Sequence, residues 1–150
     1  MAISLLVVGF LGVFSLLSRS ISLNRVAGDN YIATYLAAEG IEVARNIVDA
    51  NTIQKKSWNA GLDPGDHEIE YDESNNSFSL TPNLGRFLSF DPANNTYSYS
   101  GTIQTNFSRV IKIIWVSQNE IQVNSKVSWT TRGGGSFTVN LEDHFFDWRS

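Results

Sequence analysis

The chain contains no cysteine and only two histidines, His67 and His144, among its 150 residues. Without cysteine there can be no disulfide, no thiolate metal site and no thiol nucleophile. Basic charge is also scarce, because the formal net charge is −4, and this argues against a broad basic surface for nucleic acid. The folded part of this chain must therefore be held together by packing alone, without disulfide or thiolate–metal crosslinks.

Charge is absent from one long N-terminal stretch. Residues 2–17 form a 16-residue apolar run that holds no charged side chain and only two hydroxyls, Ser4 and Ser15. A helix that crosses a bilayer needs about 20 apolar residues, so this run falls short by itself. The residues expected in a membrane or filament-core segment are Ile3, Leu5, Leu6, Val7, Val8, Gly9, Phe10, Leu11, Gly12, Val13, Phe14, Leu16 and Leu17.

Three interpretations of this run compete. A cleaved signal peptide normally has a basic region before the run and a small-x-small cleavage site after it, whereas here nothing basic precedes Ala2 and the run exits into Ser18-Arg19-Ser20. A buried helix of a soluble protein is disfavoured because the run is apolar on every face. We therefore favour a helix that lies in a membrane or in the core of a filament.

The helical pattern continues beyond the run to about Asn51. Four large residues, Ile32, Leu36, Val43 and Ile47, fall within about 60° of one another on a helix and predict a stripe that packs on a globular head. Ile41 lies on the side opposite Ile32, so the helix has a second apolar face. A second face needs a second partner, which favours self-assembly. The alternative is a helix inserted between two parts of one fold.

Charges and glycines in the helix suggest further contacts. Arg45 follows Glu42 by three residues, a spacing that supports a helix, and Asp49 follows Arg45 by four. Glu39 lies within the stripe, either solvated at its edge or paired internally. The candidates for contacts between subunits are Glu39, Ile41, Glu42 and Arg45. Glycines interrupt the helix and indicate either close packing or deliberate weakness; they are Gly9, Gly12, Gly28 and Gly40.

Alternating apolar and polar residues dominate the rest of the chain, and alternation of this kind predicts strands. The expected strands are residues 67–71, 77–80, 87–90, 97–99, 109–117, 121–129 and 137–141. Turns are expected at residues 63–66, 75–76, 94–95, 118–120 and 132–135. The sequence therefore predicts an α+β fold, in which a long protruding helix (residues 1–51) carries a small antiparallel β-sheet head (residues 52–150).

No pattern of catalytic or metal-binding residues emerges. His67 lies among Asp66, Glu68, Glu70 and Asp72, which we interpret as a solvated acidic strand edge rather than a metal site. The loop acids and amides Asp91, Asn94 and Asn95 lack the spacing of a calcium loop, and Gly133–Gly135 lacks the context of a phosphate loop. The sequons at Asn75, Asn94 and Asn106 indicate surface loops, and the aromatic C-terminus is expected to dock on the sheet or helix. We expect no enzyme activity and no cofactor.

Three segments of the chain resemble the type IV pilin and type II secretion pseudopilin family, especially its minor-pilin-like members. Ala2–Gly9 is similar to the stretch after the prepilin cleavage motif, and Tyr35–Ile47 is similar to the amphipathic half of the pilin helix. Phe107–Trp148 resembles the last strands of minor-pilin heads, whereas residues 52–105 match only loosely. The family's processing motif, a glycine followed by phenylalanine and shortly afterwards by a glutamate, does not stand before Met1, which indicates either a late start assignment or a variant that anchors without processing.

The resemblance implies a lollipop fold and a structural role. Before assembly the helix would anchor the subunit in the inner membrane, and afterwards it would bundle with copies of itself and with other pilin-like subunits in an extracellular filament at the cell surface. Pilus assembly machinery would act on the chain, and no nucleic-acid partner is expected. The leading hypothesis is a filament subunit. The alternatives are a secretion pseudopilin and a monomeric membrane-tethered binding module that uses the sheet face or the loop at Tyr97 and Tyr99.

Overall fold

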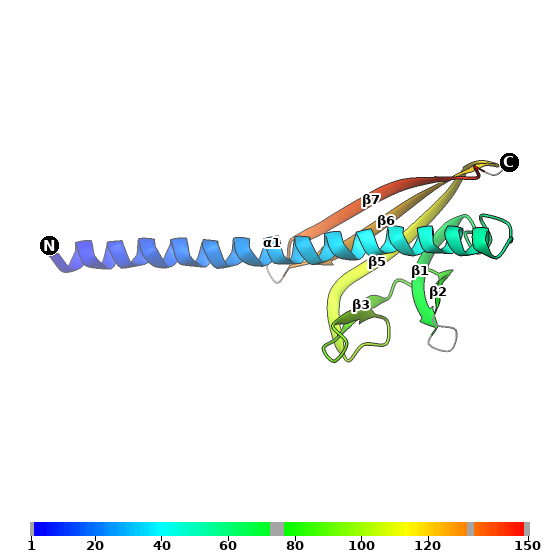
Figure 1. Cartoon of the computed structure of the whole chain (residues 1–150). Coiled ribbons are helices and arrows are strands. Elements are labelled where there is room, and N and C mark those ends of the chain that lie inside the picture. The colour runs from blue at the N-terminus through cyan, green and yellow to red at the C-terminus, as the bar shows by residue number, and fades with distance from the viewer. Residues whose placement is uncertain (1, 73–76, 132–133, 149–150) are drawn as a thin grey trace. The chain divides into compact units, whose positions relative to one another are not determined.

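The computed structural model describes residues 2–72, 77–131 and 134–148. Within these ranges the chain forms one helix followed by seven strands, the α+β order that the sequence predicts (Figure 1). The elements are α1 (Ala2–Ile53), β1 (Gly65–Asp72), β2 (Ser77–Pro82), β3 (Phe87–Asp91), β4 (Thr96–Ser98), β5 (Ile103–Ser117), β6 (Glu120–Thr130) and β7 (Ser136–Phe146).

The chain divides into two compact units, and the division lies inside α1. The first unit runs to Ile32 and is helical, whereas the second unit begins at Ala33 and contains the rest of α1 and all the strands. The domain boundary expected at residues 51 and 52 lies inside the second unit, near the end of the helix at Ile53. Residues 33–53 belong to the second unit because their side chains share a core with the strands.

Strand β5 is the centre of an antiparallel sheet. One of its edges pairs with β6 from Phe107 to Ser117, and β6 pairs in turn with β7 along its whole length. The other edge is divided, because β3 pairs with the first half of β5 and β1 pairs at residues 111–113. The expected three-strand C-terminal meander is therefore β5, β6 and β7, and the shorter strands extend it at one edge.

The sheet has one buried and one polar face, as the alternation in the sequence predicts. In β6 the residues Ile121, Val123 and Val127 are fully buried, while Gln122, Asn124 and Lys126, which alternate with the buried positions, reach the other face. The turns expected at residues 75–76 and 132–133 lie outside the described residues. After β6, Gly134 has a φ of 82°, a left-handed conformation that glycine adopts without strain.

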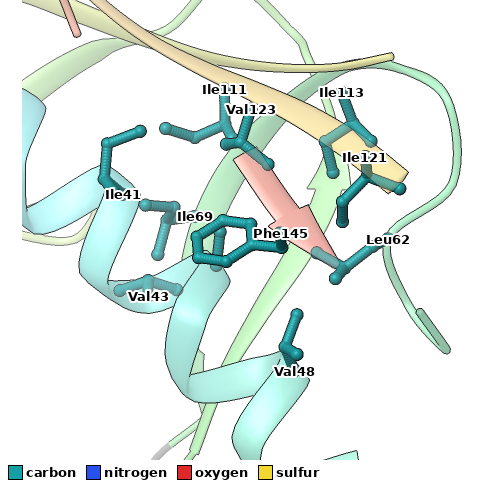
Figure 2. Packing of buried hydrophobic residues seen from close by; sticks show 11 residues of the cluster. Ile41, Val43, Val48, Leu62, Ile69, Ile111, Ile113, Ile121, Val123 and Phe145 are labelled. Carbon is teal, nitrogen blue, oxygen red and sulfur yellow. The ribbon is translucent and has the colours of Figure 1, made fainter. Parts of the chain in front are cut away.

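The core of the second unit lies between α1 and the sheet (Figure 2). Ile41, Val43 and Val48 project from the helix toward Ile111 and Val123 on the central strands. The other labelled members of the cluster are Leu62, Ile69, Ile113, Ile121 and Phe145. Phe145 is buried, so part of the aromatic C-terminus docks as expected, whereas Phe146 and Trp148 are exposed.

The buried face of α1 is broader than the stripe of large residues. Small residues occupy its middle, and Gly40 approaches the sheet so closely that an added Cβ would lie 2.2 Å from Ser125 Oγ and 2.6 Å from Ile111 Cδ1. On a helix, the flanking residues Val43 and Ile41 lie about 160° apart. The other buried residues of this face are Ala33, Leu36, Ala37, Ala44, Val48 and Asn51.

This geometry corrects the prediction for Ile41, which was expected on the back of the helix. Ile41 is only 9% exposed and belongs to the core cluster of its own unit. The prediction counted only large side chains and therefore placed the centre of the buried face at the wrong angle. Alanine and glycine let the sheet come close enough to cover both flanks.

Helix α1 ends two residues later than expected, in a Schellman-type cap. The N–H of Lys56 donates to the carbonyl of Asn51, and the N–H of Lys55 donates to the carbonyl of Thr52. Lys55 occupies the left-handed position with a φ of 56°. The amide of buried Asn51 then donates to the carbonyls of Trp58 and Ala60, which ties the following loop to the helix.

Candidate functional site

The first half of α1 presents an unusual apolar surface. Leu5 belongs to the predicted apolar run, but its side chain lies outside the described residues. Twelve large apolar side chains are each at least half exposed, from 51% for Val7 to 80% for Ile3. They are Ile3, Leu6, Val7, Val8, Phe10, Leu11, Val13, Phe14, Leu16, Leu17, Ile21 and Leu23.

An apolar surface of this size is costly in water. Full burial of one Val, Leu, Ile or Phe side chain is worth roughly 1.5–3 kcal/mol, and soluble monomers rarely expose a contiguous apolar patch above a few hundred Å². Gly9 and Gly12 interrupt this surface and have no side-chain neighbour within 4 Å of an added Cβ. Among the described residues these side chains are therefore left exposed, and the glycines leave room for another backbone to approach.

Length and composition make α1 the one described helix that could cross a membrane. The apolar run alone is shorter than a bilayer-spanning helix, but the helix continues unbroken past Leu17. An 18-residue stretch of α1 is apolar enough to lie in a bilayer, and none of this stretch is buried within the described chain. Arg19 follows the run, where its long side chain can reach from an apolar layer to water.

The four residues predicted to pack helix against head occupy different environments. Leu36 is fully buried and Val43 is nearly so, and Ile47 is half-buried against the core cluster. Ile32 is half-buried and belongs to the first unit. Three of the four residues thus lie on the helix face that packs in the second unit.

Glu39, one of the candidates for contacts between subunits, forms an ion pair inside its own unit. Its Oε2 lies 2.6 Å from Arg109 Nη1, and the same nitrogen donates to the carbonyl of Leu36. Arg109 is 3% exposed and Glu39 is 34% exposed in their side chains. The acid within the stripe therefore neutralises a buried guanidinium on β5 and is already engaged.

Glu42 and Arg45 remain on the surface. Arg45 pairs with Glu42 at 3.1 Å, as the spacing predicts, and its other nitrogen lies 2.9 Å from Asp143 on β7. The expected partner Asp49 is replaced by Asp143 because the helix lies against β7 at this point. All three paired side chains are at least one-third exposed, so a second chain could still reach Glu42 and Arg45.

The acidic edge expected on β1 is partly buried. Glu68 is 1% exposed and accepts hydrogen bonds from the N–H groups of Leu84 and Arg86 and from the Arg86 guanidinium at 2.6 Å. Burial alone would raise the pKa of Glu68, but these donors together lower it below its usual value. Arg86 also pairs with Glu70, and these two pairs raise the pKa of Arg86. Asp66 is exposed, whereas the side chain of Asp72 lies outside the described residues.

The two tyrosines proposed as a ligand-binding loop pack inward. Tyr97 packs between Phe90, whose ring is tilted to it at 5.1 Å, and Phe107, whose ring meets it edge to face at 6.4 Å. The ring of Tyr99 lies under the Arg86 guanidinium at 4.3 Å, and burial raises the pKa of Tyr99 to about 12. Both rings therefore serve the packing of the β3–β4 region, and the loop offers no exposed aromatic pair.

In the described part of the chain no group of three or more acidic or histidine residues is placed to hold a metal ion. His67 uses Nε2 to bond the carbonyl of Asp63, and Asp91 bonds Ala93 and Asn94 within its own turn. The sequons at Asn94 and Asn106 are exposed, while Asn75 lies outside the described residues. The polar residues singled out in the sequence thus serve turns and strand ends.

Comparison with known proteins returned no match, neither among family models nor among curated sequences nor among solved structures.

Proposed function

We propose that this chain is a structural subunit of a type IV pilus-like extracellular filament. One observation carries the proposal: the twelve large apolar side chains described between Ile3 and Leu23 are exposed in the isolated chain. Surface of this kind is stable only in lipid or against other protein. The antiparallel sheet and the helix that packs on it agree with the fold that the family resemblance implies. The resemblance rests on the sequence and is an argument separate from the exposed side chains.

The same segment would serve two environments in turn. Before assembly it would lie in the inner membrane as an anchor. In the filament it would leave the lipid and pack against the corresponding segments of other copies, with the heads outward in a lollipop arrangement. Gly9 and Gly12 favour this second step because small residues let helices approach closely in apolar surroundings.

Two other functions use the same anchor. A pseudopilin of a secretion system would assemble by the same helix, whereas a membrane-tethered binding module would remain a monomer. The inward packing of Tyr97 and Tyr99 removes the aromatic loop as a reason to prefer the monomer. Assembly is therefore the property that separates the filament subunit from the tethered module.

The test is assembly of the full-length chain after detergent is removed. Wild type should form thin filaments in negative-stain images. Gly12→Leu keeps the segment apolar but fills the space beside the helix, so it should enter membranes normally and form several-fold fewer filaments. Val13→Leu is the matched control, since it also adds apolar bulk but not at a glycine, and it should assemble like wild type.

Assembly contacts can also be mapped chemically. Because the chain has no cysteine, a single Leu6→Cys or Phe14→Cys substitution introduces a unique thiol. In filaments these thiols should crosslink between copies. Wild type that stays monodisperse in lipid and in water, without crosslinks, would overturn the proposal in favour of the tethered monomer.

A further inference from the structure

The face of the sheet opposite α1 contains a groove. Residues of β5 and β6 that alternate with the core residues line it, together with Asp66 of β1 and Asn140 of β7. Its volume is about 460 Å³, which is within the range of sites that hold small ligands. The groove lies entirely in the second unit, so an inference from it does not depend on filament assembly.

Two lysines, Lys112 and Lys126, face this groove. In the antiparallel register Lys112 lies opposite Asn124 and Lys126 lies opposite Val110, so the lysines are diagonal neighbours. Diagonal side chains on adjacent strands are about 7–8 Å apart, close enough for two long side chains to reach one ligand group. Within the described residues neither lysine forms an ion pair.

This arrangement contrasts with the described arginines of the same unit. Arg45, Arg86 and Arg109 each lie within 3.1 Å of a carboxylate. Like charges on neighbouring strands repel one another, so an unpaired lysine pair reduces stability slightly unless an anion lies between them. The two lysines are thus the cations of the described second-unit sheet that are available to a ligand.

The rest of the lining indicates the kind of anion. Asn140, Ser108 and Ser128 supply amide and hydroxyl groups, and Val110 and Ile114 supply apolar contact. The described lining contains no aromatic side chain on which a nucleic-acid base could stack.

The geometry points to an acidic polysaccharide as the ligand. Its carboxylates would pair with Lys112 and Lys126, and its hydroxyls would bond the amides and hydroxyls of the groove. Asp66 is the acid in the lining, where it lies opposite Lys112 in the strand register. Asp66 should therefore weaken the binding of an anion, and removing its charge should strengthen that binding, which is the opposite of the effect expected for the lysines.

Binding is measured with the full-length chain in neutral detergent micelles and with polygalacturonate as the probe. Wild type should bind it, and should not bind the methyl-esterified polymer, which has the same backbone without the charge. The double variant Lys112→Gln/Lys126→Gln should bind about tenfold more weakly, because two exposed ion contacts are lost. Asp66→Asn should bind more tightly, and Asn140→Ala several-fold more weakly.

The matched control is Lys55→Gln/Lys56→Gln, which removes the same charge from exposed lysines at the end of α1. It should bind within about twofold of wild type if the contact is local. Thermal melts identify any variant that is unfolded, and in that case Lys126→Gln alone replaces the double variant. No binding of polygalacturonate, equal weakening in both double variants, or a preference for dextran sulfate that Asn140→Ala leaves unchanged would each overturn the proposal.

Discussion

The two halves of α1 are built from similar residues but use them in opposite ways. In residues 3–23 the large apolar side chains are exposed and the glycines face open space. In residues 33–53 alanines and a glycine form the middle of a buried face, and Gly40 touches the sheet. The difference shows that apolar content by itself does not identify the packed part of this helix. Buried small residues mark the half that packs on the sheet, and large exposed side chains mark the other half.

The largest contrast should appear when one leucine is shortened in each half. Leu36 is fully buried, so Leu36→Ala should reduce the free energy of unfolding by about 2–5 kcal/mol. Leu11→Ala should change it by less than about 0.5 kcal/mol, because Leu11 is exposed. Denaturant unfolding followed by tryptophan fluorescence measures both, since every tryptophan lies at or after Trp58. Equal losses in the two variants would mean that the first half is also packed within the chain.

Removing either partner of the Glu39–Arg109 ion pair should lower the free energy of unfolding, but the two losses should differ in size. Glu39→Ala leaves the guanidinium of Arg109 buried and unpaired, and should cost about 2–3 kcal/mol, which is below the range for fully buried pairs because Glu39 is one-third exposed. Arg109→Met removes the buried charge and leaves an acid that water can reach, so it should cost less. Unfolding curves of the two variants and of the double variant make the comparison. If Arg109→Met were the more harmful change, the pair would contribute more than neutralisation of a buried charge.

Glycine-to-alanine changes should have opposite signs in the two halves. Gly40→Ala places a methyl group against Ser125 and Ile111 and should destabilise the protein by about 1–3 kcal/mol. Gly12→Ala meets open space and should favour the helix by about 1 kcal/mol. Circular dichroism in detergent reports helix content for the second variant, and thermal melts report stability for the first. A neutral Gly40→Ala would show that the sheet can move away from the helix.

The smallest effect should be a pH dependence that arises on the polar face of the sheet. The hydrogen bond of His144 Nδ1 with Glu120 at 2.7 Å, with help from Glu142, raises the pKa of His144 above its usual value near 6.5. A raised pKa means that this stabilisation is complete below about pH 6.5 and is lost as the pH rises through the folded-state pKa. Hydrogen bonds from Asn124 and Gln122 lower the pKa of Glu142, so its contribution is present above about pH 4.5 and lost in more acidic solution.

Melting temperatures between pH 5 and pH 8 test this dependence. Wild type should lose stability across the range, and His144→Gln should lose less because it cannot be protonated. The same pH series on Leu11→Ala serves as the control, since residue 11 is remote from the titrating groups in sequence and lies in the other unit. An identical slope in wild type and His144→Gln would assign the pH dependence to other groups.

Much of the fold could be predicted from local patterns. The helix was expected to end near residue 51 and ends at Ile53, and each expected strand lies within or overlaps an observed one. Such patterns are readable because alternation and helical spacing reflect the environment of neighbouring residues. Contacts between distant residues could not be read in this way. Glu68 was expected to be solvated, yet Arg86, eighteen positions later, lies over it and buries it.

The two candidate surfaces, the apolar segment and the groove, differ in the same way: the sequence predicts the first and not the second. The apolar segment from Ile3 to Leu17 was evident from the sequence because its residues are adjacent and uncharged. The groove with Lys112 and Lys126 was not, because its lining comes from four strands whose register only the folded chain sets. A signal was present in the alternation of lysines with core residues along β5 and β6, but alternation alone does not say which lysines become neighbours.

The sequence by itself therefore determined the long helix, the positions of the strands along the chain and the apolar segment, since each depends on the spacing of residues within one element. Only the tertiary structure decided which face of the helix is buried, that Ile41 lies in the core and that Glu39 is paired with Arg109. These outcomes depend on how closely the sheet approaches the helix at Gly40, and that distance is a property of packing between elements.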